Sequence, residues 1–227
     1  MVRCIAAAVA AGLFGAAAAA AELSETEQRW LRGAWPVVAW AKAERLPLDI
    51  VVQPQPAPDA APLAMAFVDG RCKLVLSMRG NPQAQATLER IPRDLQDGAL
   101  ELMAAHEVGH CRRHIDGAWF GVPAGFSDTA PPALPARLHD AWSQMRATRR
   151  EEAYADLVGL AWTSRHHAAD YPRLHAWLVA ERTRDRVPGD HHDTLAWIAG
   201  VSAERLAGPD IFAAAAALWP QGLAAEP

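Results

Sequence analysis

The chain has few cysteines, no excess of positive charge and, beyond its first 21 residues, no long apolar run. It contains 3 cysteines in 227 residues, and 22 basic residues stand against 26 acidic ones, a net charge of −4. Nucleic acid is therefore not an expected partner, because its phosphates attract basic surfaces. No later stretch approaches the roughly 18 continuous apolar residues that a membrane-spanning helix needs. We find no internal repeat and no sign of a second domain.

The first 21 residues have the pattern of a secretory signal peptide. Arg3 supplies a positive charge, an Ala-rich apolar run follows, and small residues precede the first acidic residue, Glu22. We expect cleavage near Ala21, which removes Cys4 and leaves 21 basic and 26 acidic residues, a net charge of −5. The alternative is an uncleaved anchor, since the apolar run is long. Residues 22–227 are then expected to form a single domain in the periplasm or outside the cell, without stable membrane insertion.

Two cysteines remain after this cleavage, Cys72 and Cys111. An even pair in an oxidising compartment favours a disulfide, whereas two buried free thiols are the alternative. A bridge would close a loop of about 40 residues and stabilise the fold by on the order of 4 kcal/mol.

The apolar periodicity predicts an α+β fold that is mainly helical with a small antiparallel or mixed sheet. Ser24 and Glu27 form a capping box at the start of a helix that we expect to kink near Pro36. Asp69-Gly70 lies between two apolar runs and indicates a hairpin. The strands are predicted over 48–53, 65–68 and 72–78. The helices are predicted over 24–44, 83–91, 93–115, 136–168, 171–184, 193–206 and 211–219. The Gly/Pro-rich loop over 116–135 is either a lid or a surface excursion.

His106, Glu107 and His110 form an H-E-x-x-H motif on the helix predicted over 93–115. Histidines four residues apart stand about 40° apart and about 6 Å along the helix, so both rings can reach one ion. Glu107 lies about 100° round from His106, too far to be an equal ligand but able to reach a water on that ion. The motif is typical of zinc peptidases, which use two histidine ligands and a glutamate base.

Glu152 and Asp156 are also four residues apart and share a face of the next predicted helix. A catalytic zinc takes three protein ligands and keeps a fourth position open, so we expect Glu152 as the third ligand. Asp156 would accept the free ring N–H of a ligand histidine and fix its tautomer. A solvated acidic helix face is the alternative. The expected cofactor is one Zn²⁺ per chain.

The two motifs together carry a resemblance to a known group. The segments HEVGH and EAYAD match the H-E-x-x-H plus E-x-x-x-D pattern of gluzincin peptidases. The chain most resembles the family of the prenyl-protein endopeptidases, the heat-shock membrane metallopeptidases and their soluble periplasmic relatives, over roughly residues 65–160. The resemblance implies a zincin-like domain whose edge strand lies beside the metal-binding helix. It assigns that edge to 72–78, the strand that would align substrate by β-addition.

His114 continues the four-residue series but is not an expected ligand. On a straight helix it lies about 12 Å from His106, whereas ligands of one zinc lie within about 3.5 Å of each other. We expect it beside the site or interacting with the helix C-terminus. A longer zinc pattern would place a ligand at Asp116, but Arg113 stands where its turn needs glycine. A di-iron site would need a second Glu-x-x-His, which the sequence lacks.

The segment PGDHHDTLAWI, residues 188–198, holds the other concentration of polar groups. By the same resemblance, a histidine after the third-ligand helix stabilises the oxyanion of the tetrahedral intermediate. We favour His192, with His191 as the alternative, oriented by Asp190 or Asp193. The other interpretation is that Asp193 or Thr194 caps the next helix and both histidines are solvated.

These patterns predict a zinc-dependent peptidase that acts on polypeptide substrates. His106, His110 and Glu152 would hold the metal, and Glu107 would act as general base. The alternative is a non-catalytic envelope protein of zincin fold that binds unfolded or partner proteins around a structural zinc. The intact Glu107 favours catalysis.

Overall fold

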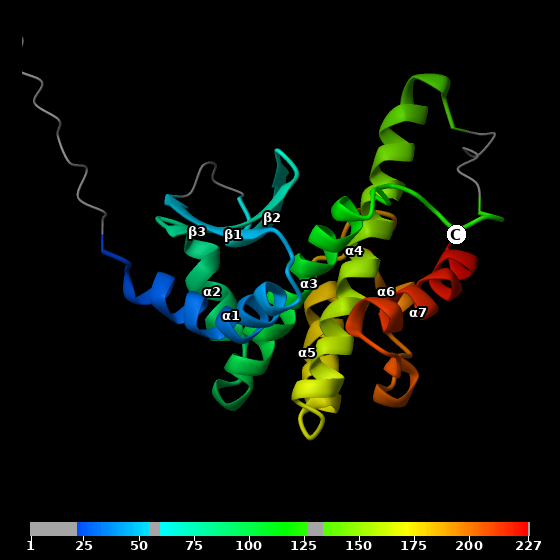
Figure 1. Cartoon of the computed structure of the whole chain (residues 1–227). Helices are drawn as coiled ribbons and strands as arrows, with labels where there is room; N and C mark the ends of the chain where they lie inside the picture. The colour runs from blue at the N-terminus through cyan, green and yellow to red at the C-terminus, as the bar shows by residue number, and fades with distance from the viewer. Residues whose placement is uncertain (1–21, 55–59, 127–133, 227) are drawn as a thin grey trace, which may run out of the picture.

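The protein, described here by a computed structural model, folds around one central helix, α3 (Gln96–Ile115). The structure describes residues 22–54, 60–126 and 134–226, so the expected signal peptide at 1–21 and part of the 116–135 loop lie outside it. Figure 1 shows the sheet with α1 and α2 on one side of α3 and α4 to α7 on the other. The fold is α+β and mainly helical, as the sequence predicts.

The N-terminal helix, α1 (Glu25–Ala43), begins at the predicted capping box. The Ser24 hydroxyl accepts a hydrogen bond from the Glu27 amide, and the Glu27 carboxylate accepts one from the Ser24 amide. Pro36 lies inside the helix on its exposed side. The opposite side of α1 packs against α3, β1 and β3, with Trp30 and Val37 buried in the core.

The sheet contains three strands, β1 (Leu48–Pro54), β2 (Leu63–Val68) and β3 (Arg71–Arg79), in the order β1-β3-β2. β2 and β3 form the predicted antiparallel hairpin, and both Asp69 and Gly70 adopt positive φ at its turn. β1 pairs with β3 in parallel, so the sheet is mixed.

The resemblance assigned the wrong strand to the edge. β3, which contains residues 72–78, lies between the other two strands, and β2 is the edge strand that contacts α3. The hairpin signal fixed the pairing of β2 with β3 but carried no information about β1. The parallel pairing of β1 covers the other side of β3, so β3 has no free edge and the strand beside α3 is β2.

The remaining elements follow the predicted order with one error. Residues 193–206 do not form one helix, because the chain contains the short α6, then a turn and a 3-10 helix at Ala203–Leu206. The last helix runs further than the predicted 219 and includes Pro220. The other helices are α2 (Pro82–Arg90), α4 (His139–His166), α5 (Tyr171–Thr183), α6 (Leu195–Ile198) and α7 (Ile211–Ala225).

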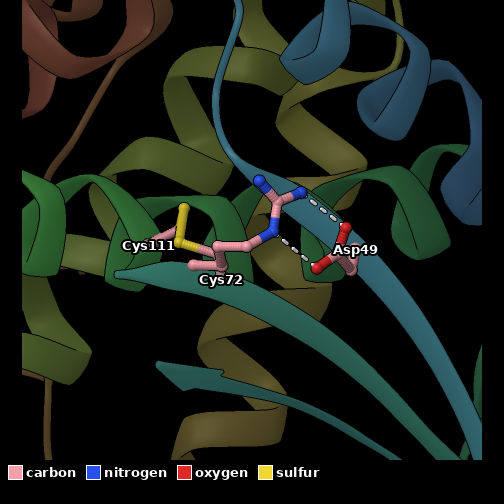
Figure 2. Close-up of a disulfide and its surroundings, with 4 residues drawn as sticks. Asp49, Cys72 and Cys111 are labelled. Carbon is pink, nitrogen blue, oxygen red and sulfur yellow. Dashed lines mark hydrogen bonds and ion pairs between the residues drawn. A yellow bond between two sulfur atoms is a disulfide. The ribbon is translucent and has the colours of Figure 1, made fainter. Parts of the chain in front are cut away.

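A disulfide between Cys72 and Cys111 joins β3 to α3, which decides between the bridge and the two free thiols that the sequence left open. It ties the middle strand of the sheet to the residue that directly follows His110 (Figure 2). Next to the bridge in sequence, Arg71 binds Asp49, with Nε and a terminal nitrogen 2.8 and 2.6 Å from the two carboxylate oxygens. Among the described residues, no helix has the length and apolar character that a membrane span requires.

Candidate metal centre

The candidate metal ligands come from α3 and α4, whose backbones approach closely. A Cβ at Gly109 would lie 3.0 Å from the Ala155 Cα, and a Cβ at Gly159 would lie 2.9 Å from the Leu102 carbonyl oxygen. Only glycine allows this spacing, because any larger residue would push the helix backbones apart. The crossing brings the H-E-x-x-H segment of α3 next to the part of α4 that contains Glu152 and Asp156.

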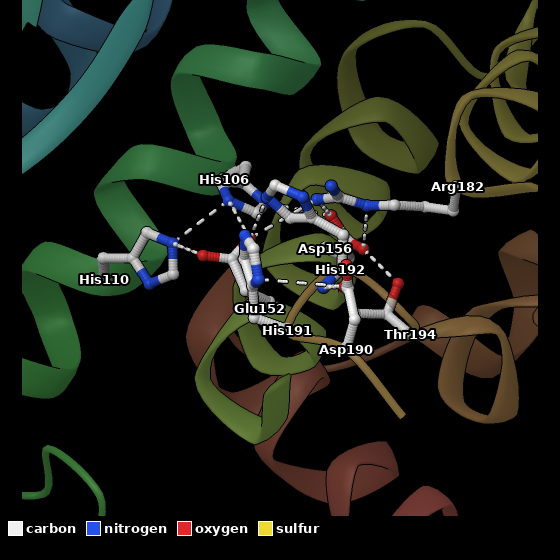
Figure 3. A network of polar contacts seen from close by, with 9 residues as sticks. All are labelled: His106, His110, Glu152, Asp156, Arg182, Asp190, His191, His192 and Thr194. Carbon is white, nitrogen blue, oxygen red and sulfur yellow. Dashed lines mark hydrogen bonds and ion pairs between the residues drawn. The ribbon is translucent and has the colours of Figure 1, made fainter. Parts of the chain in front are cut away.

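Three side chains converge at this crossing in the arrangement of a metal site. The Nε2 atoms of His106 and His110 are 3.0 Å apart, and each lies 3.4 Å from a different carboxylate oxygen of Glu152 (Figure 3). Ligands about 2.1 Å from a tetrahedral metal ion are about 3.4 Å from one another. The two imidazoles and the carboxylate therefore fit one divalent ion, as the spacing in the sequence predicts. Below, His106, His110 and Glu152 are called the metal group.

Asp156 lies beside the Nδ1 atom of His106, the ring nitrogen that does not face Glu152. Its side chain has no exposed surface, and one carboxylate oxygen lies 2.9 Å from the His106 Nδ1. The Asp156 carboxylate also accepts two hydrogen bonds from Arg182, at 2.8 and 2.6 Å, and one from the Thr194 hydroxyl at 2.6 Å. The Nδ1–H of His106 donates to the carboxylate, so the lone pair of Nε2 faces the other ligands.

The electrostatics of the group favour a bound positive charge. Burial alone would lower the pKa of His106, but the carboxylates of Asp156 and Glu152 outweigh it and raise that pKa to about 10. Burial alone would raise the pKa of Glu152, yet His106 and His110 hold it well below its usual range. The carboxylates of Asp156 and Glu152 therefore stabilise positive charge at this point.

Glu107 lines the same cavity as His106, His110 and Glu152. Burial raises the pKa of the Glu107 carboxyl, while the neighbouring His106 lowers it, and the net direction is upward. A carboxyl group with a raised pKa accepts and returns a proton near neutral pH more readily than an ordinary one. The cavity has a volume of about 490 Å³, which lies within the usual range for ligand sites, about 300–1,000 Å³.

The two histidines after α5 differ in position. The side chain of His192 is 55% exposed, lines the cavity, and its Nε2 lies 3.8 Å from a Glu152 oxygen. The Nδ1 of His191 lies 3.8 Å from an oxygen of Asp190, and the two histidine rings are 4.0 Å apart. Asp190, His191 and His192 also bring ligand atoms within 4.8 Å of one another, but they are more exposed than the first group.

The sequence predicts that Asp190 or Asp193 orients the histidines of residues 188–198, and this prediction is only partly correct. The Asp190 carboxylate accepts a hydrogen bond from the His192 amide at 2.5 Å, so it holds the backbone of that residue. Asp193 instead pairs with Arg186 and accepts from the Gly189 amide. Thr194 occupies the N-cap position of α6, but its hydroxyl donates to Asp156 instead of capping the helix.

His114 is a neighbour of the site, as the helix geometry predicts. Its ring is stacked between Phe67 and Trp119, with centroid distances of 4.8 and 3.9 Å. Burial lowers the pKa of His114 and thus favours its neutral form in this stack. Asp116, the ligand of the longer zinc pattern, pairs with Arg112 at 2.8 Å and does not reach the metal group.

Three functional residues were missed in the sequence. Arg182 lies in a charged segment that looks like a solvated helix end, and Thr194 looks like an ordinary cap. Trp119 lies in the loop after α3, lines the cavity and packs against the His110 ring in a T-shaped arrangement at a centroid distance of 5.7 Å. No local signal marks Arg182 and Thr194, because their partner Asp156 is 26 and 38 residues away.

Comparison with known proteins adds no family or relative. No family model matches the chain, and no curated protein or solved structure matches it. The residues of the site and their geometry are therefore the basis for assigning a function.

Proposed function

We propose that this protein is a zinc-dependent endopeptidase of the gluzincin type. The observation that carries the proposal is the convergence of His106, His110 and Glu152 in a cavity that also holds Glu107. Two imidazoles and one carboxylate, with open space beside them, are the donor set of catalytic zinc sites. When bound there, zinc would lower the pKa of water and polarise the scissile carbonyl.

The residues around the metal group have distinct roles in this proposal. Glu107 takes the proton of the attacking water and passes it to the leaving amine. Asp156 orients His106 and is held by Arg182 and Thr194. His192, at the mouth of the cavity, donates a hydrogen bond to the oxyanion as the tetrahedral intermediate forms.

The free edge of β2 supports a polypeptide substrate. Within the described residues β2 pairs only with β3, and Leu63 to Met65 line the cavity. An extended peptide could add to this edge through main-chain hydrogen bonds, which hold a backbone regardless of sequence. We therefore assign the proposed role of aligning substrate to β2 instead of to residues 72–78.

The disulfide supports an extracytoplasmic location for the mature protein. Such bridges form and persist in the periplasm and outside the cell and are rare in the cytosol. We therefore retain the proposal of a periplasmic or secreted protein, with an N-terminal signal peptide.

The first prediction separates metal binding from hydrolysis. We expect Glu107→Gln to keep the zinc and to lose about 10²- to 10⁴-fold in the hydrolysis rate, because it removes the base and leaves the ligands. His110→Ala should lose both the bound zinc and the hydrolysis, because it removes a ligand. The measurements are the zinc content of each purified protein and its rate of cleavage of an unfolded protein.

Glu89→Gln is the matched control, since Glu89 is exposed on α2 and does not line the cavity. It should behave as the wild type in both measurements. Equal hydrolysis by the wild type and Glu107→Gln would contradict the proposed mechanism. A wild-type protein that holds zinc but cleaves nothing would favour the non-catalytic alternative.

A further inference from the structure

The two histidines of the metal group are supported differently. The Nδ1 of His106 lies 2.9 Å from a carboxylate oxygen of Asp156. The Nδ1 of His110 is buried and makes no hydrogen bond with any residue that the structure describes. Figure 3 shows it on the side of the ring that is turned away from Glu152. A metal-binding histidine usually donates its other ring N–H to an acceptor that fixes the ring, so a different contact has to orient His110.

Trp119 makes such a contact. Its ring lies 5.7 Å from the His110 ring, centroid to centroid, and the two planes are inclined at 70°. A T-shaped pair is attractive and directional, because the positive edge of one ring meets the negative face of the other. Trp119 is also stacked on His114, with 3.9 Å between the centroids and 13° between the planes. The Trp119 ring is thus held against one histidine and favours one orientation of the other.

The chain reaches this position by turning back at the end of α3. The helix ends at Ile115, and Gly117 follows with a φ of 64°. Glycine adopts this left-handed conformation without the steric penalty of a Cβ. The Ala118 amide then donates to the Arg113 carbonyl at 2.9 Å. The chain therefore returns along the last turn of the helix and brings Trp119 beside it.

An ion pair between Arg113 and Glu151 holds the next part of the loop. The Glu151 carboxylate accepts two hydrogen bonds from Arg113, at 2.9 and 2.8 Å, and one from the Phe120 amide at 2.9 Å. Arg113 also donates to the Gly121 carbonyl at 2.6 Å. The two charged side chains are 11% and 1% exposed, so water competes little for them. Phe120 has a φ of 61°, a strained conformation that these contacts can maintain.

The ion pair joins the loop to both helices that carry the candidate ligands. Arg113 is three residues after His110 on α3, and Glu151 directly precedes Glu152 on α4. The Arg113 guanidinium also lies over the Trp219 ring of α7, 4.5 Å from its centroid. The loop is therefore fixed relative to the crossing of α3 and α4, and Trp119 keeps its place beside His110.

We propose that Trp119 is a positioning residue for His110 and that the Arg113–Glu151 pair acts by holding Trp119 in place. The proposal rests on the proposed metal site. The Trp119 ring does for His110 what the Asp156 carboxylate does for His106, but it supplies orientation without a charge. Its contribution to zinc affinity is therefore smaller than that of Asp156.

Two substitutions of Trp119 test the role of its ring. Trp119→Leu keeps an apolar side chain but removes the ring, so zinc affinity should fall by about 3- to 10-fold, the worth of one aromatic pair. Trp119→Phe keeps a ring and should restore most of the affinity. Zinc affinity is measured by competition with a chelator, and urea unfolding of the zinc-free proteins shows whether the fold is equally stable.

Trp35→Leu is the matched control, because Trp35 is 50% exposed and does not line the cavity. It should bind zinc as the wild type does. Unchanged zinc affinity in Trp119→Leu would overturn the proposal. An equal loss of affinity in Trp119→Leu and Trp119→Phe would overturn it as well, since the ring would then not matter.

A double-variant experiment tests whether the ion pair acts through Trp119. Glu151→Gln should weaken zinc binding about as much as Trp119→Leu, and the two changes together should cost no more than Trp119→Leu alone, because they remove one contact. Additive losses would contradict this part of the proposal. If Glu151→Gln fails to fold, Arg113→Lys takes its place, since a lysine keeps the charge but cannot make two parallel hydrogen bonds.

All of these measurements concern zinc binding, so they separate this proposal from the peptidase function. Weaker zinc binding by Trp119→Leu, with no cleavage by the zinc-bound wild type, would support the role of Trp119 and contradict the peptidase. Cleavage by the wild type, with unchanged zinc affinity in Trp119→Leu, would have the opposite meaning.

Discussion

Asp156 makes polar contacts with residues from three other parts of the chain. Its carboxylate joins His106 of α3, Arg182 of α5 and Thr194 at the start of α6. Burial alone would raise the pKa of Asp156, but the Arg182 charge and the His106 contact hold it well below the usual range. The side chain is therefore ionised at neutral pH and keeps one orientation of the His106 ring.

A test at this scale is Asp156→Asn, which keeps the shape of the side chain and removes its charge. We expect about a 10- to 100-fold weaker affinity for zinc, because a residue that orients a metal ligand typically contributes this much. The affinity is measured by competition with a chelator of known strength. Asp97→Asn, on the exposed start of α3, is the control. Equal zinc affinity in Asp156→Asn and the wild type would disprove the orienting role.

At the scale of elements, the crossing of α3 and α4 determines whether the ligands meet. Gly159 faces the Leu102 carbonyl, and Gly109 faces the Ala155 backbone. Both contacts involve main-chain atoms, which cannot move aside as a flexible side chain can. The two glycines therefore fix the helix separation at the point where His106 and Glu152 approach each other.

Gly159→Ala should separate these helices slightly. We expect a loss of about 1–3 kcal/mol in the free energy of unfolding, because the added methyl overpacks a tight contact. Zinc affinity should fall as well, since the ligands lie on both helices. Chemical denaturation and chelator competition measure the two effects. Gly200→Ala should show neither, because nothing lies within 4 Å of a Cβ at that position.

A second link between elements joins the end of α7 to α4. The side chain of Glu226 is 0% exposed and accepts hydrogen bonds from Arg146, Arg149 and Arg150. Burial by itself raises the pKa of Glu226, but the hydrogen bonds from Arg149 and Arg146 and the charge of Arg150 outweigh it and lower the pKa below its usual value near 4.5. The folded state thus prefers the ionised carboxylate.

This link predicts a pH-dependent effect of Glu226→Gln. The pKa of Glu226 is lower in the folded state than in the unfolded state, so its stabilising contribution is complete above about pH 4.5. The contribution is lost as the pH falls through the lowered pKa of the folded state. We expect Glu226→Gln to cost on the order of 3 kcal/mol at neutral pH, since it removes the charged carboxylate that Arg146 and Arg149 bind. Urea unfolding at about pH 7 and about pH 3 measures the difference. A cost that stays constant between them would contradict this assignment.

At the scale of the whole molecule, the disulfide connects the sheet to the central helix. The Cys72–Cys111 bridge spans 39 residues and joins β3 to α3. Both cysteines are fully buried in the main apolar core, which includes residues from the sheet and from α1, α3, α4 and α7. The bridge thus adds a covalent restraint to a core that already joins these elements.

Removing the bridge should destabilise the entire fold. We expect Cys72→Ala with Cys111→Ala to lower the free energy of unfolding by about 4 kcal/mol, because the unfolded chain regains the entropy of the closed loop. Each single variant should lose nearly as much, since one cysteine cannot form the bridge. Denaturant unfolding of all three variants tests this. Wild-type stability in the double variant would exclude a stabilising role for the bridge.

Much of this protein is determined by local sequence. The capping box starts α1, Asp69-Gly70 makes the β2–β3 turn, and the four-residue spacings place each pair of polar residues on one helix face. These features depend on residues within one or two turns of each other. The sequence could therefore predict both halves of the metal group before their contact was known.

Only the tertiary structure decided how these halves meet and what surrounds them. The parallel pairing of β1 made β2 the edge strand, and the fold of α5 and the segment before α6 brought Arg182 and Thr194 to Asp156. Each outcome depends on groups far apart in the chain, so no periodicity or spacing encodes it locally. The sequence by itself determined the candidate ligands His106, His110 and Glu152 and the order of the elements. Packing between distant segments decided which strand lies at the edge beside α3 and which residues support Asp156.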